Sequence, residues 1–205
     1  KKYENMPQPR VTAIRYQIDL HPETRNATMR GEQEIVNKTS QTLKEMHVNI
    51  SDGNFDYEIA VDGMKLEKND ERHDYRIYKI DPPMEPGEKR LMKFKVGTDI
   101  KGIANGIPLT QFAQNGTFFN NTIAPQIGYQ PGDELDDRNE RKKRGLKEKA
   151  TLPSLERDCT AHCMNTYISN NSDWVTVETT ISTTPAQIAI APGSLEKEWT
   201  EKGRR

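Results

Sequence analysis

The densest cluster of side chains that could do chemistry is the run CTAHC, which holds Cys159, His162 and Cys163. On a helix, spacings of three and four would place all three side chains on one face, where they could share a metal ion. A structural zinc site needs four ligands, and no second ligand pair stands elsewhere in the chain. Three alternatives stay open for the cysteines: a weak metal site, a local disulfide, and two ordinary thiols.

Complete catalytic motifs are absent from the sequence. It contains no H-E-x-x-H, no G-x-S-x-G, no phosphate-binding loop and no dinucleotide fingerprint. The histidines are scattered along the chain, at His21, His47, His73 and His162. We expect each to be structural or solvent-exposed, with His47 facing outward from a strand. Acid pairs such as Asp136-Asp137 stand among lysines and arginines, a pattern typical of a solvated helix surface. The sequence therefore predicts no catalytic site of its own.

The stretch NGTFFNN places two aromatic residues, Phe118 and Phe119, side by side among amides. Successive side chains of a strand face opposite sides, so the two rings cannot both enter one core. Either both faces of the sheet are covered, or one ring is exposed, sits at a bulge, or lines a cleft between domains.

Short alternating runs dominate the rest of the chain. Apolar residues recur at every second position in runs of strand length, and turn residues separate the runs roughly every ten positions. The runs cover residues 10–20, 29–37, 43–50, 55–61, 75–80, 91–96 and 173–184, with a further short one at 188–190. Asp62-Gly63 is a pair favoured in two-residue hairpin turns, and we expect a hairpin there, followed by a polar insert at 67–74.

Composition agrees with a sheet that has one wet face, since 33% of the 205 residues are apolar and 30% are charged. We predict a mainly β chain: an antiparallel β-sandwich or saddle of roughly nine to eleven strands with one or two short helices. Residues 1–9 are expected to be linker-like and 10–203 to form one domain. A charged helical insertion is expected at about 130–165, with ERKKR as a solvated helix face.

Charge and hydropathy argue against two classes of partner for this chain. The formal net charge is −1, so no global field favours nucleic acid. No apolar run reaches the roughly 18 residues that a membrane-spanning helix requires. No apolar signal-peptide segment follows the two opening lysines.

Several stretches, in their order along the chain, resemble the N-terminal domain of the aminopeptidase N family. The opening VTAIRYQIDLHPETRNATMRGEQEIVNKTSQTLKEMHVNI is similar to that family's first strands, and WVTVETTISTTPAQIAIAPGSLEKEW to the strands that leave the domain. The middle, NGTFFNNTIAPQIGYQPGDELDDRNERKKRGL, departs from ordinary members. It resembles a bacterial subgroup linked to ABC-type permeases.

The resemblance implies a β-saddle that covers a downstream catalytic domain, where the parent protein would hold zinc and hydrolyse peptides. This chain would then be non-catalytic, with no cofactor of its own. In the family, a glutamine or glutamate of a T-Q-x-E-like loop holds the substrate amine. Here Gln111 matches that glutamine, Ala113 replaces the acid, and Gln114 is a substitute. We take Gln111, Gln114, Phe118 and Phe119 as the candidate cleft residues.

The resemblance also implies a location and partners. It suggests the extracytoplasmic, periplasmic part of a bacterial inner-membrane protein, with the catalytic domain, a peptide substrate and an ABC-type permease as partners. Two alternatives stay open: a free-standing extracytoplasmic β-sandwich that binds a protein or carbohydrate, and a degenerate peptidase-like domain that serves a transporter.

Overall fold

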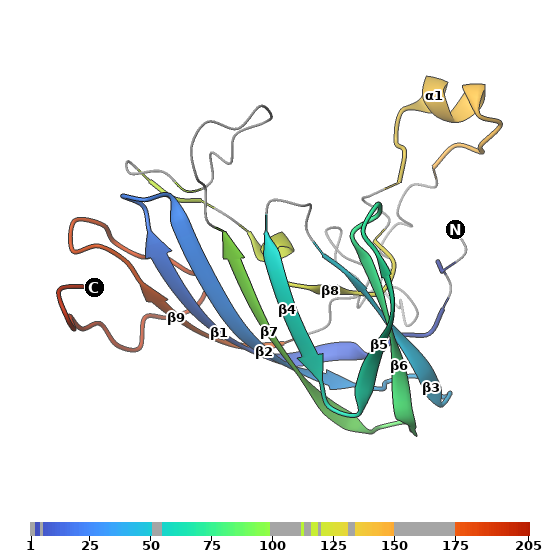
Figure 1. Cartoon of the computed structure of the whole chain (residues 1–205), viewed down its shortest axis with the longest axis horizontal. Helices are drawn as coiled ribbons and strands as arrows, with labels where there is room; N and C mark the ends of the chain where they lie inside the picture. The colour runs from blue at the N-terminus through green and yellow to red at the C-terminus, as the bar shows by residue number, and fades with distance from the viewer. Residues whose placement is uncertain are drawn as a thin grey trace, which may run out of the picture.

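The computed structural model describes residues 3–4, 6–50, 55–98, 112, 116–118, 120–130, 134–149 and 175–205. Within these residues the chain forms nine strands in two sheets, one short α-helix and one 3-10 turn (Figure 1). The prediction of a mainly β, antiparallel-dominated fold is confirmed. No helix in the described part of the chain is both long and apolar enough to cross a bilayer.

The larger sheet has five strands in the order β4-β7-β2-β1-β9. Neighbouring strands are antiparallel, except that β9 runs parallel to β1. The strands are β1 (Arg10–His21), β2 (Asn26–Val36), β4 (Asp56–Val61), β7 (Lys89–Thr98) and β9 (Thr176–Ser182). We call this the five-stranded sheet.

The smaller sheet has four antiparallel strands in the order β5-β6-β3-β8. These are β3 (Leu43–Asn49), β5 (Met64–Asp70), β6 (Tyr75–Met84) and β8 (Gln126–Ile127). The 3-10 turn (Asn121–Ile123) precedes β8. Helix α1 (Arg138–Lys143) stands away from both sheets in Figure 1.

Alternation decides which face of the five-stranded sheet is buried. Along β1, the side chains of Tyr16, Ile18 and Leu20 are buried, while Arg15 and Gln17 point to the other face and are less buried. Burial of the apolar set is the main favourable term, about 25 cal/mol per Å² removed from water. The inner face carries one apolar cluster, and a second, which includes Ile35, Met46 and Met92, fills the space between the sheets.

A close contact fixes the centre of the five-stranded sheet. Gly31 of β2 lies opposite Phe94 of β7, and a Cβ atom added to Gly31 would lie 2.1 Å from Cζ of the Phe94 ring. The ring in turn packs edge-on against Tyr16, with 5.9 Å between the ring centroids. Only glycine leaves room for the ring at this position.

The two sheets are joined at a turn, where the sequence had predicted a hairpin. β4 pairs with β7 and β5 pairs with β6, so Asp62-Gly63 carries the chain from one sheet to the other. The Arg90 guanidinium, which is buried, donates to the carbonyls of Gly63 at 3.1 Å and Pro82 at 2.7 Å. The Gly63 carbonyl also accepts from the Asp81 N–H at 2.8 Å, so Arg90 is its second donor, and the buried guanidinium is itself ion-paired with Glu88 at 2.8 Å. We call this cluster the Arg90 joint.

Three local expectations differ from the structure. Residues 67–70 of the expected polar insert belong to β5, because an edge strand with exposed side chains needs no apolar pattern. Residues 188–190 form no strand, and Ile188 and Ile190 are exposed. The predicted helix exists at Arg138–Lys143, capped by the Asp137 carboxylate, which accepts from the Glu140 N–H at 2.7 Å. Arg141 of ERKKR is buried and donates to the Leu135 carbonyl, so that run is not wholly solvated.

Candidate functional site

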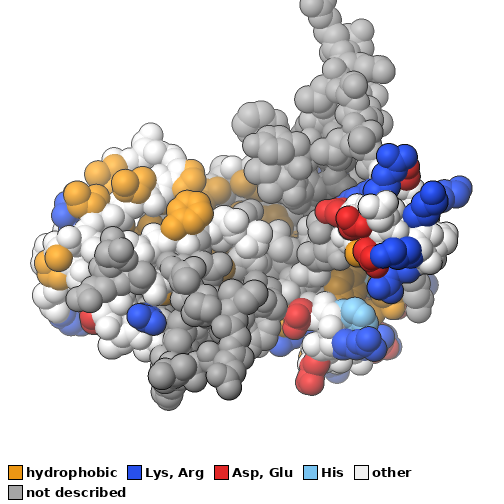
Figure 2. Space-filling view, turned by 90° about the horizontal axis from the view of Figure 1, so that it is seen from above, with side chains coloured by type: hydrophobic (Ala, Val, Ile, Leu, Met, Phe, Trp, Pro, Cys, Tyr) orange, Lys and Arg blue, Asp and Glu red, His pale blue; other side chains and the backbone are white. Residues whose placement is uncertain are grey.

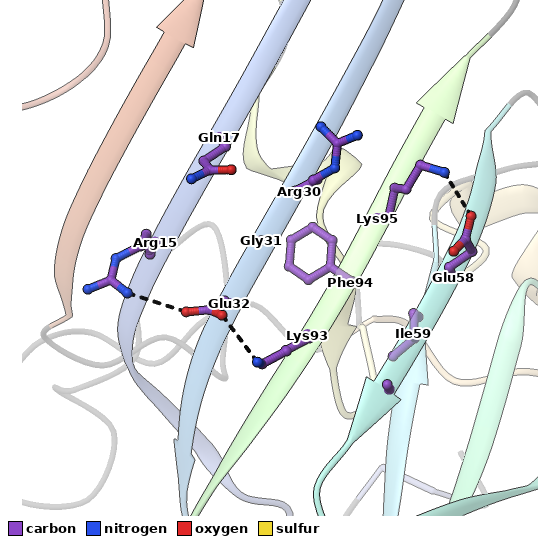
Figure 3. A pocket seen from close by; sticks show the side chains of 11 residues that line it. Arg15, Gln17, Arg30, Gly31, Glu32, Glu58, Ile59, Lys93, Phe94 and Lys95 are labelled. Atoms are coloured by element: carbon purple, nitrogen blue, oxygen red, sulfur yellow. Dashed lines mark hydrogen bonds and ion pairs between the residues drawn. The ribbon is translucent and has the colours of Figure 1, made fainter.

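A concavity of about 530 Å³, which we call the hollow, lies on the polar face of the five-stranded sheet. Figure 3 shows side chains from four adjacent strands around it, with Arg15 and Gln17 on β1, Arg30 and Glu32 on β2, Lys93 and Lys95 on β7, and Glu58 on β4. Strand pairing places these residues in two parallel rows across the sheet.

The first row alternates in charge over four strands. Glu178 of β9 pairs with Arg15 at 3.2 Å, Arg15 with Glu32 at 3.4 Å, and Glu32 with Lys93 at 3.5 Å. Opposite charges on directly facing residues stabilise a sheet, whereas like charges there destabilise it. This row is therefore internally neutral and holds its own register.

The second row carries an excess of positive charge. It runs from Gln17 through Arg30 and Lys95 to Glu58, and only the last two form an ion pair, at 2.9 Å. Arg30 is exposed, and no hydrogen bond or ion pair joins it to another described residue. Arg30 therefore presents an unneutralised guanidinium next to Lys95.

The ion pairs around the hollow are weak, so its charged side chains can make reversible contacts with a polar ligand. The ion-paired side chains around it are between 38% and 75% exposed, so water screens each pair and each contributes at most about 1 kcal/mol. Among the described residues, neither a histidine nor a cysteine lines the hollow. The arrangement offers guanidinium, ammonium and amide donors to an anionic or carbonyl-rich surface, and its described lining holds no nucleophile with a neighbouring base.

A buried aromatic cluster lies on the four-stranded sheet. His47 is 1% exposed, in contrast to the outward orientation that the sequence predicted. Its Nδ1 lies 3.0 Å from the Tyr75 hydroxyl, and the ring of Tyr3 packs edge-on against it at 4.7 Å. A tyrosine from the start of the chain covers the ring, and no local pattern reveals such a contact. The cluster fastens the start of the chain to this sheet.

Burial governs protonation in this cluster. It lowers the pKa of His47, although the nearby Glu45 carboxylate, 3.4 Å from Nε2, opposes the shift. Burial and the neighbouring Tyr3 raise the pKa of Tyr75 to about 12. His47 is thus a neutral packing group at neutral pH and is poorly placed to exchange protons with a substrate.

Metal-ligating side chains do not gather in the described part of the chain, where no group of three or more His, Cys, Asp or Glu could hold an ion. The CTAHC residues Cys159, His162 and Cys163 lie outside the described residues. The structure therefore leaves the alternatives for these three residues open.

Most of the predicted cleft residues also lie outside the described part of the chain: Gln111, Gln114 and Phe119. Phe118 is described, and its side chain is 81% exposed. Phe112, between the two glutamines, is 2% exposed and packs edge-on against Phe55 at 6.3 Å in the inner apolar cluster. Of the four candidates, the structure therefore places Phe118 alone.

Sequence reasoning missed the hollow. The polar residues of β1 were recognisable in the sequence as Arg15, Gln17 and Asp19. Which residues of β2, β7 and β4 lie beside them depends on the register of these three strands, which the sequence pattern of one strand does not give. One part of that register was accessible in principle, because opposite charges at matching positions favour facing residues.

Solved structures with a fold similar to that of this chain include M1 zinc metallopeptidases. An M1 zinc metallopeptidase from Deinococcus radiodurans matches 96% of this chain with a TM-score of 0.50 at 10% sequence identity. A two-domain M1 zinc metallopeptidase mutant bound to L-arginine matches equally well, again at 10% identity and over 96% of this chain. The fold is shared with part of these metallopeptidases.

The likeness is one of fold and covers only part of the other proteins. This chain spans 37% and 38% of the two metallopeptidase chains. A scan against protein-family descriptions finds no match, and no curated protein sequence matches either.

Proposed function

We propose that this chain is the non-catalytic, β-rich N-terminal domain of a zinc aminopeptidase, which packs on a catalytic domain and covers its cleft. The observation that carries the proposal is the fold match, which takes in nearly all of this chain and little more than a third of M1 zinc metallopeptidases. The order of motifs in the sequence independently resembles the N-terminal domain of the aminopeptidase N family.

Exposed apolar side chains near the end of the chain support a packing role. Val177, Ile188, Ile190, Leu195 and Trp199 are each at least 48% exposed. Figure 2 shows hydrophobic side chains gathered at the end of the molecule where Figure 1 places β9 and the C-terminal segment. Apolar residues that cluster on a surface mark sites of contact with other polypeptide.

In the parent enzyme, zinc would activate a water for attack on the peptide bond next to the N-terminal residue of a substrate. The ligands of that zinc would lie in the catalytic domain. The part proposed for this chain is to shape the cleft, with Gln111 or Gln114 accepting hydrogen bonds from the substrate amine and Phe118 and Phe119 lining the wall. An amide in place of a carboxylate supplies no charge, so it would hold the ammonium more weakly.

A finer proposal concerns location. The run at 115–146 supports membership of the subgroup linked to ABC-type permeases, which would make the parent a membrane-linked, periplasmic enzyme. This proposal rests on the sequence resemblance alone. The parent's interaction with a permease would be tested by co-purification from detergent-solubilised membranes.

A second candidate function is a binding module without peptidase activity. The hollow around Arg30 favours it, because the surplus cation and neighbouring amide offer a site for a polar ligand. A partner protein or carbohydrate would then be recognised on the polar face of the five-stranded sheet.

Zinc content and aminopeptidase activity separate the two functions. We expect the 205-residue chain to be free of zinc and inactive, and the natural protein purified from its own cells to hold zinc and to cleave aminoacyl p-nitroanilides. Stoichiometric zinc in the 205-residue chain would make Cys159, His162 and Cys163 a metal site and overturn the assignment. A natural protein without H-E-x-x-H and without activity would favour the binding module.

A further inference from the structure

Strand β9 ends the five-stranded sheet and has one strand neighbour among the described residues, β1. Along its other side, no described residue forms a backbone hydrogen bond with Val177, Thr179 or Ile181. The strand is rich in β-branched residues, reading TVETTIS, which is the composition of a paired strand. An edge of this kind is a template for a further strand.

The pairing of the residue after β9 shows how this edge is oriented. The N–H of Thr183 donates to the Arg205 carbonyl at 2.8 Å, and the N–H of Arg205 donates to the Thr183 carbonyl at 3.0 Å. Such a mutual exchange is the hydrogen-bonded pair of an antiparallel ladder. Backbone groups alternate in direction along a strand, so those of Ile181, Thr179 and Val177 point to the same side as those of Thr183.

The pair is held firmly in place by Arg204. Its guanidinium donates to the Leu20 carbonyl at 2.7 Å, to the Asp19 carboxylate at 2.7 Å and to the Ser182 hydroxyl at 2.9 Å. These contacts fix the C-terminal segment against both β1 and β9. Thr183 and Arg205 therefore form the first hydrogen-bonded pair of an antiparallel ladder beside β9.

The faces of β9 define the side chains of the strand that fits. Val177 lies in register with Ile14 of the inner face, yet is 54% exposed, so its free side is open to a further apolar contact. On the outer face Glu178 begins the alternating row with Arg15. An apolar residue beside Val177 would continue the inner face, and a basic residue beside Glu178 would extend the alternating row by one position.

We infer that the edge of β9 that no described strand pairs with binds an extended segment of the proposed metallopeptidase's own polypeptide, which joins the five-stranded sheet antiparallel to β9. The segment alternates apolar residues on the inner face with hydroxyl or basic residues on the outer face. Only the source of the segment rests on the proposed function; the register rests on the pair between Thr183 and Arg205.

Amide hydrogen exchange with a synthetic strand tests the inference on the 205-residue chain. The probe is a capped peptide of about nine residues, long enough to span β9, that alternates valine with threonine and carries one lysine opposite Glu178. We expect the amides of Val177, Thr179 and Ile181 to exchange rapidly alone and at least about tenfold more slowly with the peptide. The same peptide with N-methyl groups on its donors is the control and should give no protection.

A proline pair in β9 provides the matched variants. In Thr179→Pro the lost N–H points away from β1, so the chain should keep its circular dichroism spectrum and lose the protection by the peptide. In Thr180→Pro the lost N–H points to β1, so β9 itself should open and Glu178 should become rapidly exchanging.

Three results would overturn the inference: unchanged exchange with the peptide, equal protection by the N-methyl control, or undiminished peptide binding by Thr179→Pro. Slow exchange without peptide, together with the mass of a dimer, would assign the edge to a second copy and also overturn it. A natural protein lacking zinc would remove the proposed function and leave these exchange results intact, so the two failures are distinguishable.

Discussion

The contact between Gly31 and Phe94 predicts that Gly31→Ala destabilises the chain when the Phe94 ring is present and does not when that ring is removed. In Gly31→Ala the new Cβ would lie 2.1, 2.4 and 2.8 Å from the ring atoms Cζ, Cε1 and Cε2. Ordinary carbon contacts are about 3.5–4.0 Å, so the ring would have to move by roughly 1.5 Å. Tyr16 packs edge-on against the ring and resists that movement (Figure 3 shows Phe94 beside Gly31).

The magnitude follows from two opposing terms. Overpacking costs about 1–3 kcal/mol, while replacing glycine by alanine within a strand contributes about 0.5–1 kcal/mol of stability. We expect Gly31→Ala to lower the free energy of unfolding by about 1 kcal/mol in the chain that keeps Phe94. In a Phe94→Leu background the three contacting ring atoms are gone, so the same change should be neutral or stabilising.

Urea unfolding followed by far-ultraviolet circular dichroism measures the four members of this cycle. Gly97→Ala in β7 is the matched control, because no atom lies within 4 Å of the added Cβ, and it should stabilise slightly. An equal loss from Gly31→Ala with and without the Phe94→Leu change would refute the reasoning, since the coupling between the two positions should be about 2 kcal/mol.

Further predictions concern the joint, the buried histidine and the charged rows. Arg90→Met removes the guanidinium donor from the carbonyls of Asp62 and Pro82 and leaves Glu88 without its ion-pair partner, while the Gly63 carbonyl keeps the Asp81 N–H. It should cost about 2–4 kcal/mol in urea titrations, with Arg90→Lys intermediate; a loss below about 0.5 kcal/mol would contradict the joint. Because burial lowers the pKa of His47, the unfolded chain binds the proton first as the pH falls, and stability should decrease below about pH 6.5 by up to about 1.4 kcal/mol per unit. His47→Phe should flatten that slope, and an unchanged slope would assign the titration to another group. Glu32→Gln should cost at most about 1 kcal/mol at low salt and nothing in about 1 M NaCl; a salt-independent loss would show that its ion pairs are not solvent-screened.

Local pattern in the sequence predicts most strands and fails where pairing is distant. The run from Tyr16 to Leu20 alternates cleanly because one face of β1 is buried, so its strand was predictable. The division into two sheets was not, because Asp62-Gly63 has the composition of a hairpin turn and becomes a crossing only through the pairing of β4 with β7 and of β5 with β6, both later in the chain.

The candidate site shows the same limit. Arg15 and Glu32 were visible as polar residues of two strands, but their meeting across the sheet depends on register, which one residue of slippage would destroy. His47 alternates as an exposed residue would, and its burial depends on Tyr3 from the start of the chain. For Gln111, Gln114, Cys159 and Cys163, outside the described residues, the predictions stand as sequence-based hypotheses.

The parallel pairing of β1 with β9 has a consequence for synthesis of the chain. Arg15 and Glu178, which meet across this pair, are 163 positions apart. At about 5–20 residues per second, a ribosome would need roughly ten to thirty seconds to deliver the partner of β1 after β1 itself has emerged. During that interval β1 presents an unpaired edge with Ile14 and Ile18 beside it, so the nascent chain is most prone to aggregate before β9 arrives. A chaperone that shields extended apolar segments would act on this protein during elongation, rather than after release.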